Sequence, residues 1–175
     1  MSFEKAVRAS DVRLTAFSMS ALSDNRAMII KYINFIVPPV GLGILWYYNT
    51  CETSCASLRG SLLGIDLKLI GMAYMETLFL LGVWELFSLR LDAPVLVILT
   101  VLLSGAIGGE VYLVRFQVMN ETYCVYCLLY GFCIATMYAL NFPRMNLPLS
   151  ITSVLAGLTL FGLGLQASVL PMYDV

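Results

Sequence analysis

Residues 94–114 read PVLVILTVLLSGAIGGEVYLV, a run in which Glu110 is the only charged residue. A helix crosses the hydrocarbon core of a bilayer with about 20 residues, so this run is long enough to span a membrane. Four further runs of similar length and character lie at Ala27–Tyr48, Leu67–Leu89, Tyr123–Phe142 and Leu149–Leu170. The sequence therefore predicts an all-α membrane protein with five transmembrane helices.

The polar segments between these runs are short, except for the connection from Asn49 to Asp66, which we expect to be a loop. Helices joined by short links run antiparallel and form a compact bundle. We divide the chain into a cytoplasmic or interfacial segment (residues 1–26), a four-helix transmembrane bundle (27–145), and a fifth transmembrane helix with a short C-terminal end (146–175).

The composition excludes several classes of function. Only 12% of the 175 residues are charged, whereas soluble domains carry about a quarter. Ten Lys and Arg stand against eleven Asp and Glu, so there is no basic surface for nucleic acid. Histidine is absent, which removes imidazole metal sites and Cys-His catalytic pairs. Any chemistry would have to come from cysteine, carboxylate or a bound cofactor.

The distribution of basic residues predicts the orientation. With a cytoplasmic N-terminus, only Arg59, Lys68 and Arg115 of the ten Lys and Arg fall outside, and the other seven fall inside. Cytoplasmic loops carry the excess of Lys and Arg in multi-pass proteins. We therefore expect the Asn49–Asp66 loop and the start of the fourth span to face the extracytoplasmic side of the cell membrane.

Four of the five cysteines gather at that predicted outer face. Cys51 and Cys55 lie in the long loop, and Cys124 and Cys127 lie where the fourth span begins. Cys133 lies on a different side of the same helix, and we expect it to be a small buried hydrophobe. Extracytoplasmic compartments are the oxidising ones, so the two pairs predict thiol–disulfide chemistry.

The spacing Cys124-Val125-Tyr126-Cys127 places both sulfurs on one face of a helix, close enough for a disulfide. Thr122 is a plausible N-cap, which would put Cys124 in the first turn. The positive end of the helix dipole would stabilise a thiolate there. This pattern indicates a redox-active dithiol, and we assign no metal ligand.

Two other interpretations of the cysteines stay open. The four thiols could form inert disulfides that staple the outer loops of a non-catalytic membrane scaffold. They could also form a tetrahedral four-cysteine metal site, although the three-residue spacer between Cys51 and Cys55 does not favour it.

The combination of motifs resembles the vitamin K epoxide reductase family in its microbial, disulfide-forming version, without a fused thioredoxin domain. The resemblance covers about residues 27–145 and rests on the pair Cys51 and Cys55, the segment Ser57–Ile65, the opening Gly71–Tyr74 of the second span, and the segment Glu121–Cys127. It implies a four-helix transmembrane bundle around a quinone, to which prokaryotic members often add a fifth span.

The resemblance also implies an activity and a role for each cysteine. Cys127 would lie next to the quinone with Cys124 as its partner, and Cys55 would exchange with Cys124. Cys51 would accept electrons from a secreted thioredoxin-like protein, which we expect to be a separate polypeptide. The chain would then be a quinone-dependent disulfide oxidoreductase that uses a quinone of the ubiquinone or menaquinone type.

The residues that would contact the quinone are marked by less specific sequence patterns than the cysteines are. The family has a loop hydroxyl, for which Ser57 is preferred over Ser61. Tyr74, Tyr126 and Tyr130 are expected to contact the quinone ring, although tyrosines near a membrane surface also form an interfacial belt. Carboxyl groups inside spans are functional candidates by default, and they occur here at Glu76, Glu85 and Glu110. For Glu76 we favour structural hydrogen bonding over proton transfer.

Overall fold

The computed structural model describes residues 28–48, 58–88, 93–121 and 123–169. It contains five helices that are long and apolar enough to cross a membrane. These are the Met28–Tyr48 helix, α2 (Leu67–Phe87), α3 (Ala93–Met119), α4 (Val125–Asn141), which the short helix η2 (Phe142–Arg144) continues, and α5 (Leu147–Gly164). The prediction of an all-α, multi-pass membrane protein is confirmed.

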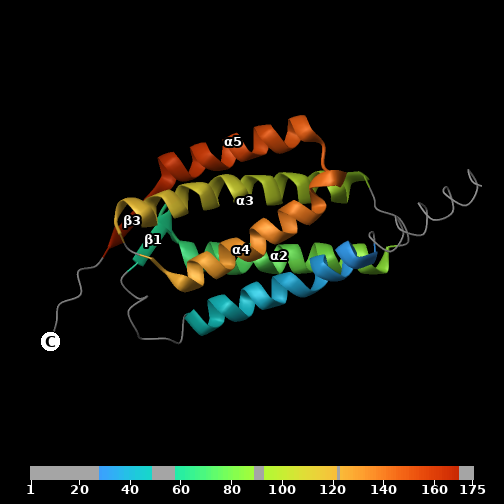
Figure 1. Cartoon of the computed structure of the whole chain (residues 1–175), viewed down its shortest axis with the longest axis horizontal. Coiled ribbons are helices and arrows are strands. Elements are labelled where there is room, and N and C mark those ends of the chain that lie inside the picture. Colours follow the sequence, from blue (N-terminus) through green and yellow to red (C-terminus); the bar gives the residue numbers. More distant parts are fainter. Residues whose placement is uncertain (1–27, 49–57, 89–92, 122, 170–175) are drawn as a thin grey trace, which may run out of the picture.

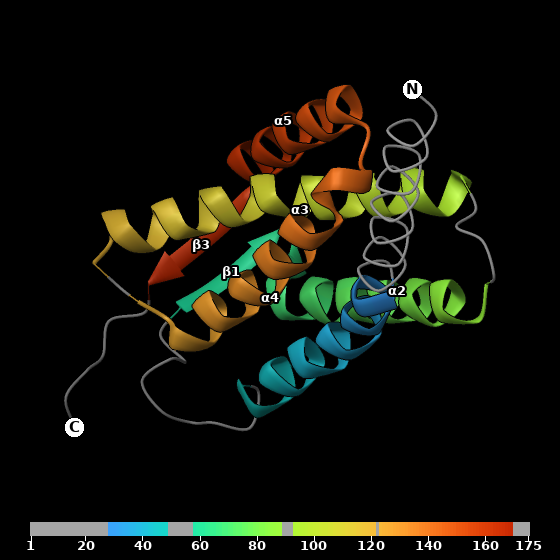
Figure 2. The same ribbon diagram turned by 45° about the vertical axis from the view of Figure 1, so that its right-hand side comes forward.

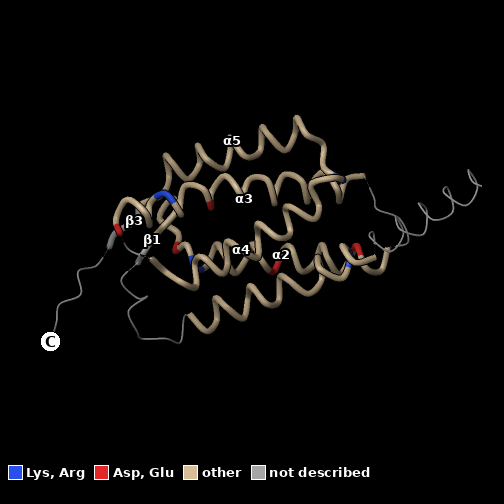
Figure 3. Tube along the Cα trace, viewed as in Figure 1, with Lys and Arg blue, Asp and Glu red and all other residues tan. Residues whose placement is uncertain are grey.

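Consecutive helices run in opposite directions along the bundle (Figures 1 and 2). At one end of the bundle, the ends of the helices lie close to a small sheet; these helix ends are Tyr48, Leu67, Met119, Val125 and Gly164. We call this the sheet end, and the other the opposite end. Charged residues lie mainly toward the two ends, while acidic residues also occur along α2 and α3 (Figure 3).

The sheet has three antiparallel strands in the order β2-β1-β3. Strand β1 (Leu58–Leu62) turns into β2 (Ile65–Asp66) through Leu63 and Gly64, whose φ angles are +55° and +83°. Two successive positive φ angles are typical of the tight turns that connect hairpin strands. Part of the Asn49–Asp66 connection is therefore a hairpin and not the loop that the sequence suggested.

Strand β3 (Leu165–Val169) corrects the predicted end of the fifth span. The apolar run continues to Leu170, but the helix ends at Gly164 and the chain then pairs with β1. Glycines at 162 and 164 weaken the helix there. The carbonyl of Gly164 also accepts the N–H of Leu63 at 3.0 Å, so strand pairing satisfies backbone groups that a helix would otherwise bond.

Helices α3 and α5 pack at very close range through small residues. A Cβ atom at Gly108 would collide with the carbonyl oxygen of Val154, and one at Gly157 with the carbonyl oxygen of Gly105. Stripes of small residues allow membrane helices to approach in this way. This contact fixes α5 against the bundle.

A buried polar cluster holds the opposite end of the bundle together. Asn34 of the Met28–Tyr48 helix and Asn141 of α4 exchange side-chain hydrogen bonds of 2.7 and 3.1 Å. Asn34 also donates to Glu85 of α2 at 2.7 Å, and Arg144 forms a 3.0 Å salt bridge with Glu85. Glu85 is 4% exposed, so this carboxyl is paired and serves packing.

Candidate functional site

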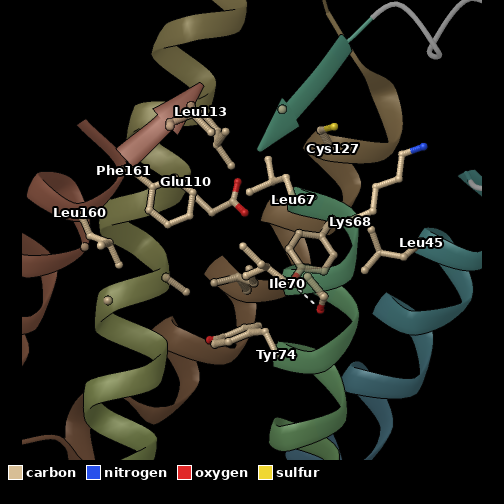
Figure 4. Close-up of a pocket in the computed structure, with 18 of the residues that line it drawn as sticks. Leu45, Leu67, Lys68, Ile70, Tyr74, Glu110, Leu113, Cys127, Leu160 and Phe161 are labelled. Carbon is tan, nitrogen blue, oxygen red and sulfur yellow. Dashed lines mark hydrogen bonds between the residues drawn. The ribbon is translucent and has the colours of Figure 1, made fainter. Parts of the chain in front are cut away.

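An apolar cavity of about 670 Å³ lies among the helices toward the sheet end (Figure 4). Sites for small organic molecules are commonly about 300–1,000 Å³ in size and mostly apolar. Apolar side chains from three helices form part of the wall: Leu67 and Ile70 of α2, Leu113 of α3, and Leu160 and Phe161 of α5. The cavity is thus large enough to hold a small ring compound.

Cys127 lies in the wall of this cavity, and Cys124 lies beside it at the start of α4. Cys124 is the N-cap of the helix: its backbone is extended, and its sulfur accepts the N–H of Cys127 at an N···Sγ distance of 3.4 Å. The sequence prediction of Thr122 as the cap and Cys124 in the first turn is therefore wrong, because Cys124 itself takes the N-cap position; Thr122 lies outside the described residues. A sulfur that receives a helix N-terminal N–H sits where negative charge is stabilised.

The two sulfurs differ in their access to the surroundings. Cys124 is 1% exposed, whereas Cys127 is half-buried and borders the cavity. The N–H of Cys124 donates to the side-chain oxygen of Gln117 at 3.0 Å, across the turn from α3. Cys133 is partly buried and packs against the central core, in line with its expected structural role.

The predicted loop residues Cys51, Cys55 and Ser57 lie outside the described residues. The chain on either side of them is described: Tyr48 and Gly60 both line the same cavity as Cys127. The described residues on both sides of residues 49–57 therefore border the same cavity as Cys127. Ser61, the alternative hydroxyl, is described in β1 and does not line the cavity.

All three tyrosines expected at the site line the cavity: Tyr74, Tyr126 and Tyr130. The hydroxyl of Tyr74 donates to the carbonyl of Leu102 at 3.3 Å, and that of Tyr130 donates to the carbonyl of Gly71 at 3.1 Å. These hydroxyl groups cross-link α2 with α3 and α4, so the two rings are held in fixed positions at the cavity.

Tyr126 belongs to an aromatic group at the sheet end. Its ring centroid lies 5.7 Å from that of Tyr47 and 5.8 Å from that of Tyr48. The Nζ of Lys68 lies 4.5 Å from the centroid of the Tyr48 ring, which is a cation–π distance. Lys68 also lines the cavity, so a positive charge and several rings stand near its sheet end.

The two remaining acidic candidates have different surroundings. Glu110 of α3 lines the cavity, and Figure 4 shows its carboxyl pointing inward at a level between Cys127 and Tyr74. Glu76 of α2 is exposed on the outside of the bundle and has no hydrogen bond within the described part of the chain. The structural hydrogen bond favoured for Glu76 is therefore not found there.

Two contributors to the site were missed in the sequence. Gln117 looked like an ordinary polar residue near the end of a span, and only its burial together with the Cys124 contact reveals its role. The fifth helix looked like an addition to a complete bundle, yet Ala156, Gly157 and Leu160 of α5 line the cavity. A signal was present in the small residues of α5, which are typical of close helix contact.

In the described ranges, no three His, Cys, Asp or Glu side chains come together as ligands for a metal ion. Cys51 and Cys55, which the four-cysteine metal site would need, lie outside those ranges.

Comparison of the chain with models of protein families finds no match, and comparisons with curated proteins and with solved structures find none either.

Proposed function

We propose that this protein is a quinone-dependent disulfide oxidoreductase of the cell membrane. A secreted thioredoxin-like protein would give up its thiol electrons to Cys51 and Cys55. These would reduce the Cys124–Cys127 disulfide, and the resulting dithiol would pass its electrons to a quinone of the ubiquinone or menaquinone type. The net result is a new disulfide in exported proteins.

The observation that carries this proposal is the position of Cys127 in the wall of the apolar cavity. The cavity fits a quinone in size and in its hydrocarbon lining, and the Tyr74 and Tyr130 rings offer aromatic surface. A bound quinone supplies the acceptor for two electrons and two protons. Cys127 is the residue that borders it, while Cys124 is buried behind, at the helix N-cap.

The local structure favours reactive thiols at this point. The N-terminus of α4 presents N–H groups and a positive dipole end to the Cys124 sulfur, which stabilises a thiolate and makes it a good leaving group. A dithiol at the boundary between water and lipid is what a transfer between soluble thiols and a lipid-soluble quinone requires.

The sequence count of Lys and Arg, seven against three, supports the orientation we propose, with the N-terminus cytoplasmic and the sheet end extracytoplasmic, because cytoplasmic regions carry the excess of basic residues. Among the described basic side chains, Lys31 and Arg144 lie at the opposite end of the bundle, whereas Lys68 and Arg115 lie toward the sheet end. The cysteines would then lie on the oxidising side.

The proposal is tested with the purified, reduced protein and a short-chain ubiquinone or menadione, by following the quinone absorbance. We expect stoichiometric quinone reduction by the wild type and none by Cys127→Ala or Cys124→Ala. Cys133→Ala is the matched control and should retain the wild-type rate. If the wild type consumes no quinone, the proposal is wrong and a disulfide-stapled scaffold is favoured. Zinc retained after desalting, in stoichiometric amount, would favour the metal-binding alternative.

A further inference from the structure

The carboxyl group of Glu110 is a polar group in a cavity whose lining is mostly apolar. It projects from α3 into the space that Cys127 borders, and Leu67, Leu113 and Phe161 surround it (Figure 4). A carboxyl group in hydrocarbon surroundings is costly unless another polar group interacts with it. We therefore looked for a polar group that forms a hydrogen bond or ion pair with the Glu110 carboxyl.

The fold itself offers no hydrogen bond to this carboxyl in the part of the chain that the structure describes. The hydroxyl groups of Tyr74 and Tyr130, which line the same cavity, donate instead to the backbone carbonyls of Leu102 and Gly71. Glu85 provides the contrast, because its oxygens are bonded by Asn34 and Arg144. Glu110 is thus the cavity carboxyl whose bonding capacity is available to a ligand.

Space for the carboxyl group is made by a glycine on the facing helix. A Cβ atom at Gly131 of α4 would lie 2.7 Å from the Oε2 atom of Glu110 and 3.2 Å from its Cδ. A larger residue at 131 would displace the end of the Glu110 side chain. The bundle therefore accommodates the carboxyl in this position, beside the helix that carries Cys127.

We propose that Glu110 binds a carbonyl oxygen of the quinone and donates a proton to it during reduction. This inference rests on the proposed function and assigns a catalytic residue to the same site. As two electrons leave the Cys124–Cys127 dithiol and its disulfide forms, the O–H bond of the Glu110 carboxyl breaks and an O–H bond to the quinone oxygen forms. The Glu110 carboxylate then regains a proton released by the dithiol. The second thiol proton goes to the other quinone oxygen, so atoms and electrons balance.

Binding is measured first, without turnover. In a Cys127→Ala background, the infrared spectrum should contain a protonated-carboxyl band that moves when menadione is added. Glu110→Gln should abolish this moving band. Glu76→Gln is the matched control because Glu76 is the exposed acidic residue of α2, outside the cavity, and it should leave the moving band in place.

Turnover is measured second, with the native cysteines. Glu110→Gln should lower kcat for menadione reduction by about 100-fold, the lower range for loss of a general acid, with a much smaller change in KM. Glu110→Asp should recover part of kcat, and Gly131→Ala should lower it while the carboxyl is still present. Glu76→Gln should turn over like the wild type. Thermal unfolding of each variant separates a folding defect from a catalytic one.

The outcomes separate this inference from the function on which it rests. If the wild type reduces menadione and Glu110→Gln matches its kcat, or still shows the moving band, the role of Glu110 is wrong and the oxidoreductase proposal stands. If Glu110→Gln does not fold, Glu110→Asp and Gly131→Ala decide in its place, and wild-type kcat in both would overturn the role. If the wild type itself reduces no quinone, the proposed function is wrong and this inference with it.

Discussion

The side-chain oxygen of Gln117 accepts the backbone N–H of Cys124 at 3.0 Å, and both residues are buried. Gln117 lies in the last turns of α3 and Cys124 is the N-cap of α4, so the bond spans the turn between the two helices. It holds Cys124 in the extended conformation from which its sulfur accepts the N–H of Cys127. The end of α3 thereby sets the geometry of the dithiol.

Replacing Gln117 with leucine should weaken the fold and slow the redox step. The substitution leaves the buried N–H of Cys124 without its acceptor, which costs about 1–3 kcal/mol of unfolding free energy. Denaturation in mixed micelles measures this loss, and the quinone assay measures the rate. Gln166→Ala is the control, because Gln166 is exposed in β3. Wild-type stability and rate in Gln117→Leu would show that the bond does not position Cys124.

The amide pair at the opposite end should be a stability element alone. Asn141→Leu removes both bonds with Asn34, and polar contacts between membrane helices are worth up to about 2 kcal/mol. We expect Asn34→Leu and Asn141→Leu to lower unfolding free energy, and a double-mutant cycle to give a coupling of about 1 kcal/mol. Thr136→Val, which loses only a bond to Phe132 within α4, is the control. Additive losses would show that the pair does not interact energetically.

The sequence predicts the five helices well because they depend on local properties. A run such as residues 94–114 is apolar on every side, and lipid leaves helix as the stable form for such a segment. The Cys124-x-x-Cys127 spacing likewise determines a shared helix face without reference to the rest of the chain. Tyr126 and Tyr130, which the sequence offers as possible contacts of a quinone ring, both line the cavity.

The strand β3 and the different surroundings of Glu85 and Glu110 depend on tertiary contacts, so the sequence alone does not predict them. Leu165–Val169 continues an apolar run, and only the presence of β1 beside it turns this segment into a strand. Glu85 and Glu110 are both single acidic residues in apolar runs, so the sequence does not distinguish them. The structure separates them because Arg144 and Asn34 reach Glu85, while the cavity surrounds Glu110.

Alanine substitution should destabilise the protein at a glycine in the α3–α5 contact and not at a glycine with free space around it. Gly157→Ala would force its Cβ against the carbonyl oxygen of Gly105, and overpacking of this kind costs about 1–3 kcal/mol. Gly43→Ala meets nothing within 4 Å, and alanine is a better helix former by up to about 1 kcal/mol. Denaturation in micelles should therefore show a less stable Gly157→Ala and an unchanged or more stable Gly43→Ala. A stable Gly157→Ala would contradict the close approach of the two helices.

Tyr130 should bind the quinone with its ring and not with its hydroxyl. The hydroxyl already donates to the carbonyl of Gly71, so Tyr130→Phe should leave KM for a short-chain ubiquinone unchanged while lowering unfolding free energy by about 1 kcal/mol. Tyr130→Leu removes the ring and should raise KM about 3- to 10-fold, the value of one aromatic contact. Steady-state kinetics on both variants decides between ring and hydroxyl. An equal rise in KM for the two would assign the contact to the hydroxyl.

The two cysteine pairs should have different redox partners during turnover. Under the proposed relay, Cys51→Ser removes the residue that exchanges with the soluble partner but leaves Cys124 and Cys127 intact. Turnover with a protein thiol should stop, whereas turnover with a small membrane-permeant dithiol should continue in part, because the dithiol can reduce the inner pair directly. Cys127→Ala should abolish both activities, and Cys133→Ala neither. Equal loss of both activities in Cys51→Ser would mean that the outer pair takes part in the quinone step itself, and the linear order of the relay would have to be abandoned.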